Sequence, residues 1–227
     1  MTSGIHDISV RLGPGTVPWP GMSPVAERSV FADVARGDAV TGSSWSLNSH
    51  VGTHVDAPTH FLPDGKDIAS TPLDRYLGRC VVLDLTDVEG RDVERADLDG
   101  RPELDGHTRM LMKTSNCRRL WHLDTFDSDY VALAHSGAQW LVERGFRLAG
   151  IDYQGIERFD TTTNPTHKTL LGAECAILEG ADLREVEPGE YVLIALPLAL
   201  EDGEASPVRA LLVEPGALAA VLEIGSP

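Results

Sequence analysis

The sequence has 227 residues, 42% of them hydrophobic and 24% charged, which predicts a folded protein and excludes a disordered chain. Its formal net charge is -16 and it contains no run of Lys and Arg, which excludes nucleic acid and anionic membranes as partners. No stretch approaches the roughly 18 consecutive apolar residues of a membrane-spanning helix, and the N-terminal residues do not resemble a signal peptide, so we expect a cytoplasmic protein.

Glycine and proline punctuate the first part of the chain, and apolar runs dominate the rest. Residues 12–28 contain Gly13-Pro-Gly and Trp19-Pro-Gly sequences, which predict a loop-rich segment. Buried strands are predicted where β-branched and other apolar residues follow one another, at residues 80–85, 110–114, 150–153, 175–178, 191–196 and 208–213.

The clearest helical pattern lies at residues 135–145. Ala138, Leu141 and Val142 follow the spacing i, i+3, i+4, and Gly145 provides a C-terminal stop before a further strand at residues 146–152. Short helices are predicted near residues 72–76 and 94–98, and residues 217–224 fit either a helix or a strand. The sequence predicts a single strand-rich α/β or α+β domain over residues 1–227, because no change of composition marks a linker.

Four side chains of metal-binding type fall within eleven residues, at His50, His54, Asp56 and His60. Imidazole nitrogen and carboxylate oxygen are good ligands for Zn²⁺ or Mn²⁺. Pro58 and the glycine and β-branched residues between them disfavour a helix, and in an extended segment the four even-numbered positions point to the same side. We therefore predict a metal site on a bent, extended segment rather than four unrelated surface residues.

Ligands from one segment alone leave such a site incomplete, so distant residues are needed. The histidines outside the segment are the first candidates: His6, His107, His122, His135 and His167. His167 is favoured because it lies in a polar loop that leads into an apolar run. Glu179 is favoured because it ends a predicted strand, where a carboxylate can return to the site.

The segment from His50 to His60 matches every fixed position of the pattern His-x-Gly-Thr-His-x-Asp-x-Pro-x-His. With it, the chain resembles the cyclase family of metal-dependent hydrolases, which includes bacterial kynurenine formamidases. The resemblance covers nearly the whole chain, including Val17-Pro-Trp-Pro-Gly, His167-Lys-Thr-Leu-Leu-Gly and Ser206-Pro-Val-Arg. It implies a layered β/β/α fold similar to swivelling domains, and a homodimer or homotetramer.

The resemblance also implies two metal positions that share one ligand. His50, His54 and Asp56 would hold the first ion. Asp56, His167 and Glu179 would hold the second, so that Asp56 bridges the pair. Zn²⁺ is the expected metal, as one or two ions, and Mn²⁺ is the alternative. Glu174, which lies near Glu179 in the sequence, is then a bystander.

His60 and Trp19 receive roles beside the metals. The resemblance makes His60 the proton donor and acceptor, for which the pKa of an ordinary imidazole is suited. Trp19 stands between two prolines and would form a rigid aromatic wall of the substrate pocket. Together with metal-activated water, these residues imply hydrolysis of a small aryl formamide or cyclic amide, with N-formylkynurenine as the leading candidate.

Three other functions stay open at this point. Residues 152–159 depart from the Ser-x-Asp arrangement of established kynurenine formamidases, and Gln154 could face the site instead. Isatin-like cyclic amides therefore remain alternative substrates, as do lactones or the substrate of a secondary-metabolism cyclase. The third function is a non-catalytic binding protein that the metal only stabilises. Structural zinc sites favour cysteine-rich shells, and the cluster contains no cysteine.

Overall fold

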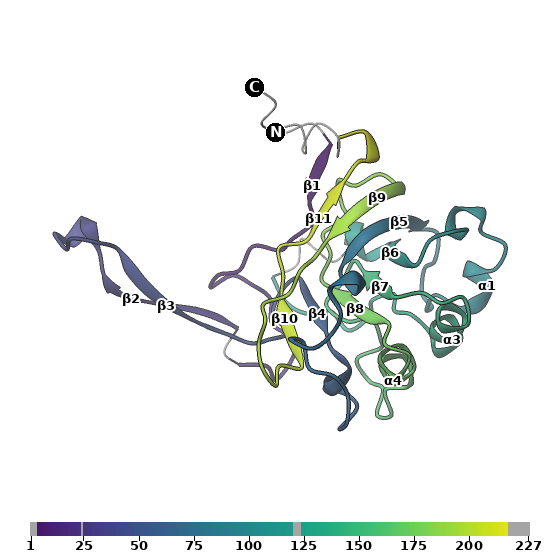
Figure 1. Cartoon of the computed structure of the whole chain (residues 1–227), viewed down its shortest axis with the longest axis horizontal. Helices are drawn as coiled ribbons and strands as arrows, with labels where there is room; N and C mark the ends of the chain where they lie inside the picture. Colours follow the sequence, from purple (N-terminus) through teal and green to yellow (C-terminus); the bar gives the residue numbers. More distant parts are fainter. Residues whose placement is uncertain (1–3, 24, 120–123, 218–227) are drawn as a thin grey trace.

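The computed structural model describes residues 4–23, 25–119 and 124–217, and its centre is a mixed sheet with helices on one side (Figure 1). The central strands of this sheet run parallel to one another. They are β5 (Leu77–Leu85), β6 (Arg109–Thr114), β7 (Leu148–Ile151) and β8 (Ala176–Glu179).

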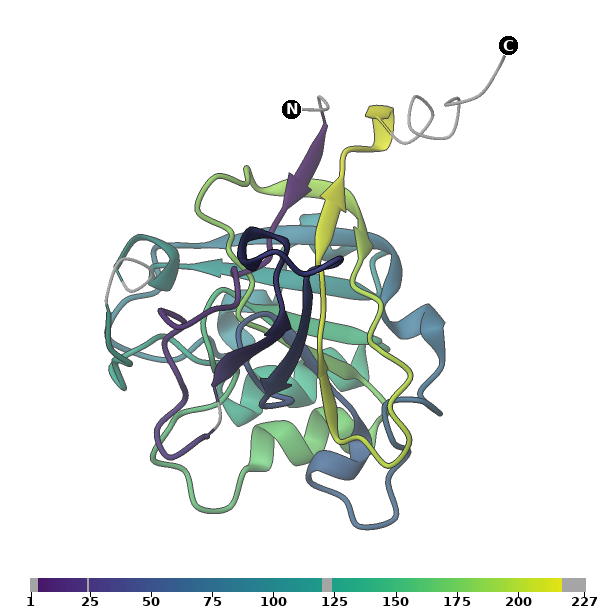
Figure 2. The same cartoon turned by 90° about the vertical axis from the view of Figure 1, so that its left-hand side faces the viewer.

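Antiparallel strands extend the parallel strands on both sides. Beyond β5 lie β9 (Gly189–Ile194), β11 (Leu211–Val213) and β1 (Ile5–Asp7), and beyond β8 lie β4 (His54–Asp56) and β10 (Ala205–Pro207). The order is therefore β1-β11-β9-β5-β6-β7-β8-β4-β10. The sheet curls into a half-barrel, which Figure 2 shows from the side.

Helices cover one face of the central strands (Figure 1). Helix α3 (His135–Glu143) packs against both α4 (Pro165–Gly172) and α1 (Arg95–Leu98). The other helical segments are short: α2 (Asn116–Arg119) and the 3-10 turns η1 (Val34–Arg36), η2 (Pro58–His60), η3 (Leu73–Arg75) and η4 (Pro102–Leu104). In the part of the chain that the structure describes, no helix has the length and apolar character needed to cross a bilayer.

Two hydrophobic cores lie on the two faces of the central strands. Val81 and Leu83 of β5 belong to the core beneath the helices, which Leu141 of α3 also joins. Cys80 and Val82, the alternate residues of β5, belong to the core inside the curled sheet. Strands buried on both faces have near-continuous apolar sequences, which is why they could be predicted. The layers confirm the strand-rich β/β/α arrangement that the resemblance implies.

Most predicted elements are found in the structure. The apolar runs correspond to β5, β6, β7, β8 and β9, and the run at residues 208–213 forms a strand only from Leu211. The helix predicted at residues 135–145 is α3, and residues 94–98 contain α1. Residues 72–76 contain only the 3-10 turn η3. The prediction for residues 217–224 falls outside the described residues except at Ala217.

Two predictions of local structure need correction. The segment from His50 to His60 is bent as predicted, at Gly52 with a φ of 63° and at Pro58, which begins the turn η2, but it is extended only in β4. His167 lies in helix α4 and not in a loop. Pro165 occupies the first helical turn, where its missing N–H is not needed.

A protruding hairpin was not predicted at all. It consists of β2 (Ala26–Ala32) and β3 (Gly42–Leu47), which pair only with each other and form a separate two-stranded sheet. β2 begins inside the segment predicted to be a loop, and serine-rich β3 lacks the apolar run that marks the other strands. Figure 1 shows the hairpin extending away from the body of the protein.

Asp152, which directly follows β7, ties this strand to the end of β6. Its carboxylate accepts hydrogen bonds from the backbone N–H of Thr114 at 2.8 Å, the Thr114 hydroxyl at 2.7 Å and the backbone N–H of Cys117 at 3.2 Å. The side chain is completely buried, and this burial raises the pKa of Asp152 to about 6.

We predict that Asp152→Ala lowers the free energy of unfolding by roughly 2–4 kcal/mol, because buried donors lose their acceptor. The raised pKa adds a pH dependence. Asp152 binds its proton more tightly in the folded state than in the unfolded state. Its contribution to the free energy of unfolding is therefore greatest below pH 4 and declines as the pH rises through about 6. Urea unfolding should show that Asp152→Ala lowers the free energy of unfolding by more at pH 5 than at pH 7.5. Asp64→Ala, at an exposed loop carboxylate, is the control. An equally small effect of both substitutions would contradict the prediction.

Candidate metal centre

The centre of the cluster is a cross-strand pair between β4 and β8. His54 lies directly opposite Glu179 in the antiparallel register, and the His54 Nε2 atom is 3.3 Å from Glu179 Oε2. Asp56 lies two residues after His54, so its side chain points to the same face of the strand. Asp56 Oδ1 is 3.6 Å from His54 Nε2. The sheet thus brings two carboxylates and one imidazole to a single buried point.

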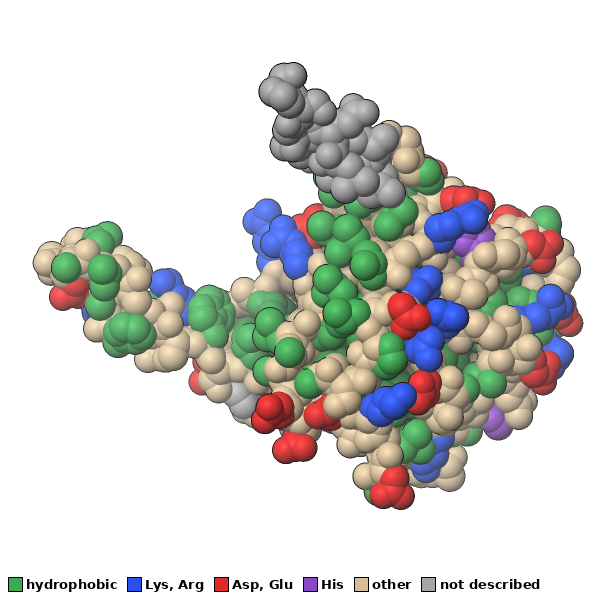
Figure 3. Space-filling view, viewed as in Figure 1, with side chains coloured by type: hydrophobic (Ala, Val, Ile, Leu, Met, Phe, Trp, Pro, Cys, Tyr) green, Lys and Arg blue, Asp and Glu red, His purple; other side chains and the backbone are tan. Residues whose placement is uncertain are grey.

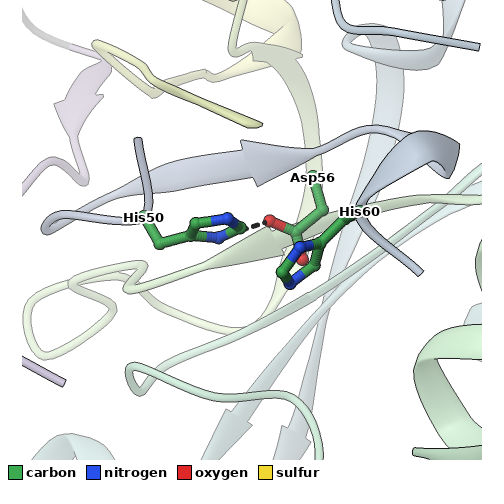
Figure 4. A group of neighbouring side chains, drawn as sticks. All are labelled: His50, Asp56 and His60. Atoms are coloured by element: carbon green, nitrogen blue, oxygen red, sulfur yellow. Dashed lines mark ion pairs between the residues drawn. The ribbon is translucent and has the colours of Figure 1, made fainter. Parts of the chain in front are cut away.

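The turns on either side of β4 add His50 and His60. His50 Nδ1 lies 3.2 Å from Asp56 Oδ1, and the His60 ring is packed on the His50 ring with 4.2 Å between centroids. Figure 4 shows His50 and His60 approaching Asp56 from two segments of the chain. The bends before and after β4 therefore bring His50 and His60 back to Asp56.

A close contact between two backbones holds these segments together. Gly180 follows Glu179 with a φ of 70°, and a Cβ at this position would lie 2.4 Å from the carbonyl oxygen of Gly52. The Thr53 hydroxyl donates a hydrogen bond to the Gly180 carbonyl at 2.6 Å. His54 Nδ1 donates to the Gly52 carbonyl at 3.0 Å, so Nε2 is the atom that His54 presents to the cluster.

Helix α4 brings His167 to the opposite side of the same carboxylates. His167 Nε2 is 3.4 Å from Glu179 Oε1 and 3.9 Å from Asp56 Oδ2. All five residues predicted as ligands, together with His60, therefore surround one region, although more than a hundred residues separate the motif from His167 in the sequence.

Unsatisfied buried atoms show that this region fits a cation. His54 Nε2 and both carboxylate oxygens of Asp56 are buried without a hydrogen-bond partner among the described residues. Such atoms are costly unless a cation or another partner compensates them. Two triplets have ligand atoms within 4.8 Å of one another, His50 with Asp56 and His60, and His54 with Asp56 and Glu179. Asp56 is common to both. This grouping includes His60, to which the resemblance gives a proton-transfer role instead.

The cluster also attracts positive charge. Burial alone would lower the pKa of His54 and His167, but the nearby carboxylates raise these values to about 9 and about 10. Burial opposes ionisation of Glu179, yet the ion pairs with His167 and His54 hold its pKa far below the usual range. His60 differs, because burial lowers its pKa.

The prediction missed Glu157, which orients His167. Glu157 is buried, lies 2.6 Å from His167 Nδ1 through Oε2 and accepts the backbone N–H of Thr166 at 2.8 Å through Oε1. A hydrogen bond at Nδ1 leaves Nε2 facing Asp56 and Glu179. Residues 152–159 depart from the Ser-x-Asp arrangement, but nothing in their sequence pattern pairs Glu157 with a histidine ten residues later.

The other candidates lie in different surroundings. His6 pairs with Glu214, His107 with Glu190 and His135 with the Thr169 hydroxyl, while His122 lies outside the described residues. Glu174 forms surface ion pairs with Lys66 at 2.6 Å and Arg75 at 3.3 Å. None of these pairs involves the cluster.

A cavity of about 260 Å³ opens onto the cluster. His60, His167 and Glu179 line it on one side, and Trp19, Phe159 and Gln154 are also among its lining residues. A larger hollow of about 400 Å³ near Trp140 is lined by none of the clustered residues.

The Trp19 side of the cavity is built from stacked aromatic rings. The Trp19 ring contacts Phe126 edge to face at 4.9 Å and lies tilted on Phe159 at 5.4 Å. Gly155 makes room for it, because a Cβ there would lie 2.7 Å from the indole. Trp19 and Gln154 thus both line the cavity.

Comparison with known proteins agrees with this architecture. The family described as "Putative cyclase" matches residues 6–158. A kynurenine formamidase of Erythrobacter litoralis (strain HTCC2594) is 37% identical over 214 residues, which cover 92% of this chain and 94% of the relative. The structure of a potential metal-dependent hydrolase with cyclase activity superposes with a TM-score of 0.79 at 31% identity, covering 93% of this chain and 98% of the other.

A structure of an isatin hydrolase bound to the product analogue thioisatinate also superposes with a TM-score of 0.79. The identity is 21%, and the match covers 93% of this chain and 92% of the other. At this identity the similarity concerns the fold alone. Together, the sequence and structural matches confirm the family predicted from the histidine-rich motif.

We predict that Glu157→Ala weakens binding of Zn²⁺ or Mn²⁺ by about 10–100-fold, because the His167 ring loses the partner that orients it. Glu157→Gln keeps the size and one acceptor and should fall between Ala and wild type. Competition with a chelating dye measures both affinities without any substrate. Glu174→Ala removes a surface carboxylate and is the matched control. Unchanged metal affinity in Glu157→Ala, with the fold intact by circular dichroism, would rule out the orienting role.

Proposed function

The chain belongs to the cyclase family, and from this premise we propose that it is a metal-dependent hydrolase of small aryl formamides, with N-formylkynurenine as the first candidate substrate. The observation that carries the proposal is the position of the cluster. Buried, unsatisfied ligand atoms lie beside a cavity with an aromatic wall. The kynurenine formamidase at 37% identity supports the choice of formamide among the candidate substrates.

We assign the metal to the ligand atoms that converge on Asp56. His50, His54 and Asp56 would hold one ion, and Asp56, His167 and Glu179 would hold a second, so that Asp56 is shared between them. Nitrogen and oxygen ligands without cysteine suit Zn²⁺ and Mn²⁺. A bound divalent ion supplies Lewis-acid polarisation of a carbonyl group and water that ionises near neutral pH.

His60 is the proposed proton carrier, because it lines the cavity beside the cluster. Its ring is held between His50 and Phe61, with centroids at 4.2 Å and 4.3 Å. This packing holds the imidazole at the wall of the cavity. His60 would take the proton released by the attacking water and deliver it to the nitrogen of the leaving aryl amine.

The aromatic wall would favour a substrate that carries an aryl group. Trp19 and Phe159 present ring surfaces to the cavity, and Phe126 supports Trp19 from behind. Edge-to-face contacts with a substrate ring would orient the formamide toward His60. The cavity volume of about 260 Å³ suits a substrate with one aromatic ring.

We predict that the metal-loaded protein releases formate from N-formylkynurenine, that EDTA abolishes this activity, and that added Zn²⁺ or Mn²⁺ restores it. Absorbance of the aryl amine product follows the reaction, and isatin serves as the comparison substrate. No turnover of N-formylkynurenine by protein that retains its metal would remove this substrate. Turnover of isatin but not of N-formylkynurenine would show that the substrates are cyclic amides instead of aryl formamides.

A second prediction concerns His60. His60→Ala should lower kcat by about 100-fold or more, the usual contribution of a positioned general acid–base, while the metal content per chain stays near that of wild type. His135→Ala, at a histidine that pairs with Thr169 outside the cluster, is the control. If His60→Ala retained both metal and full turnover, the proton-carrying role would have to be abandoned. If it lost its metal, His60 would act as a ligand instead.

A further inference from the structure

A second hollow, of about 310 Å³, adjoins the cavity at the metal centre. We call it the outer hollow, and its lining residues are Ser128, Arg158, Phe159 and Asp160. Arg158 and Phe159 also line the cavity of about 260 Å³, so the two spaces meet at these side chains. A substrate whose aromatic ring occupies the cavity can therefore extend a substituent into the outer hollow.

Arg158 is held in place but keeps hydrogen-bond donors available for a ligand. Its Nε donates to Asp92 Oδ1 at 2.6 Å, and the same oxygen accepts the backbone N–H of Ala132 at 3.3 Å. Asp129 Oδ1 lies 3.9 Å from Arg158 Nη1, which is too far for a hydrogen bond. Neither Nη atom of Arg158 donates a hydrogen bond within the described residues. A guanidinium group fixed through one edge presents its other donors in a defined direction.

Arg158 is also the only Arg or Lys among the described residues that line either space. The chain has a net charge of -16, and acidic and basic side chains lie intermingled on the face of the body that Figure 3 shows. An anionic group therefore gains little from the overall field of the protein and needs a specific cation beside it. Because guanidinium matches the geometry of a carboxylate, Arg158 favours a carboxylate in the outer hollow.

Asp160 places the opposite charge in the same hollow. This residue is exposed, and its carboxylate forms no ion pair within the described residues. The outer hollow thus offers a guanidinium group with spare donors and an unpaired carboxylate. These two groups match the carboxylate and the ammonium of an α-amino acid. A simple carboxylic acid would fit less well, because Asp160 would repel it.

We propose, on the basis of the function proposed above, that the outer hollow binds the zwitterionic α-amino-acid group of the substrate, with Arg158 at its carboxylate and Asp160 at its ammonium. The substrate class is then an aryl formamide whose ring carries an amino-acid side arm. The formamide lies in the cavity beside His60, and the side arm crosses Phe159, which is 41% exposed. Arg158 determines specificity and takes no part in the chemical step.

Two substrates that differ only in the side arm test this proposal. N-formylkynurenine carries the amino-acid group, and o-formamidoacetophenone has the same ring, formamide and ketone without it. Wild type should prefer N-formylkynurenine by at least about 10-fold in kcat/KM, and Arg158→Gln should lower this preference by about 10–100-fold through a higher KM, since a charge-assisted hydrogen bond is lost. Arg158→Lys keeps the charge and should recover part of the preference.

Controls distinguish substrate binding from a structural role of Arg158. Arg184 also pairs with an aspartate, Asp182 at 2.7 Å, and lines neither space, so Arg184→Gln should keep the wild-type preference. Asp160→Asn should reduce the preference by only about 2–5-fold, as expected for an exposed ion pair. If Arg158→Gln lowered kcat/KM for both substrates equally, the preference would be unchanged and the proposal would be overturned.

Binding of the aryl amine products tests the outer hollow separately from turnover. In titration calorimetry, kynurenine should bind wild type about 10–100-fold more tightly than o-aminoacetophenone, and Arg158→Gln should remove this difference. Equal binding of both amines to wild type would overturn the proposal for the outer hollow, even if both formamides were hydrolysed. Hydrolysis of neither formamide by the metal-loaded protein would overturn the proposed function instead, and tighter binding of kynurenine would still support the outer hollow as an amino-acid site.

Discussion

The structure depends on a buried carboxylate that the protein alone leaves unsatisfied. Neither oxygen of Asp56 accepts a hydrogen bond within the described residues, although the side chain is completely buried. A buried negative charge is tolerated only beside positive charge. In the protein itself this charge comes from imidazoles whose pKa the carboxylates raise, as at His54. A divalent cation would replace those protons, so the same electrostatics that hold the cluster together prepare it for a metal.

Three parts of the fold bring side chains to the cluster around Asp56. Antiparallel pairing of β4 with β8 sets His54 opposite Glu179, and the contact between Gly52 and Gly180 holds the flanking turns close. Helix α4 supplies His167 from the helical layer, and Glu157 fixes the direction of its ring. Loop residues provide the aromatic wall of the cavity. Rigid elements therefore carry the ligands, while the adjoining loops carry the groups that would contact the substrate.

The sequence predicted those elements and ligands whose placement follows from one local feature of the chain. Strands such as β5 are buried on both faces and have continuous apolar runs, and the ligands of the His50–His60 motif lie close together in the sequence. The sequence did not predict helix α4 or the role of Glu157. The Glu157 carboxylate accepts a hydrogen bond from the first turn of that helix, and this tertiary contact leaves no local pattern in the sequence. The β2–β3 hairpin was missed because Ser43, Ser44 and Ser46 break the apolar pattern of β3.

The central claim is that Asp56 is the shared ligand of the metal centre. Crystals grown with Zn²⁺ or Mn²⁺ and measured at the absorption edge of the metal test it most directly, since anomalous density locates the ion independently of any assay. The account predicts a peak bonded to an Asp56 oxygen and to His54 or His50, with a second ion, where present, bonded to the other Asp56 oxygen. Anomalous density elsewhere in the protein, with Asp56 free of metal, would contradict it.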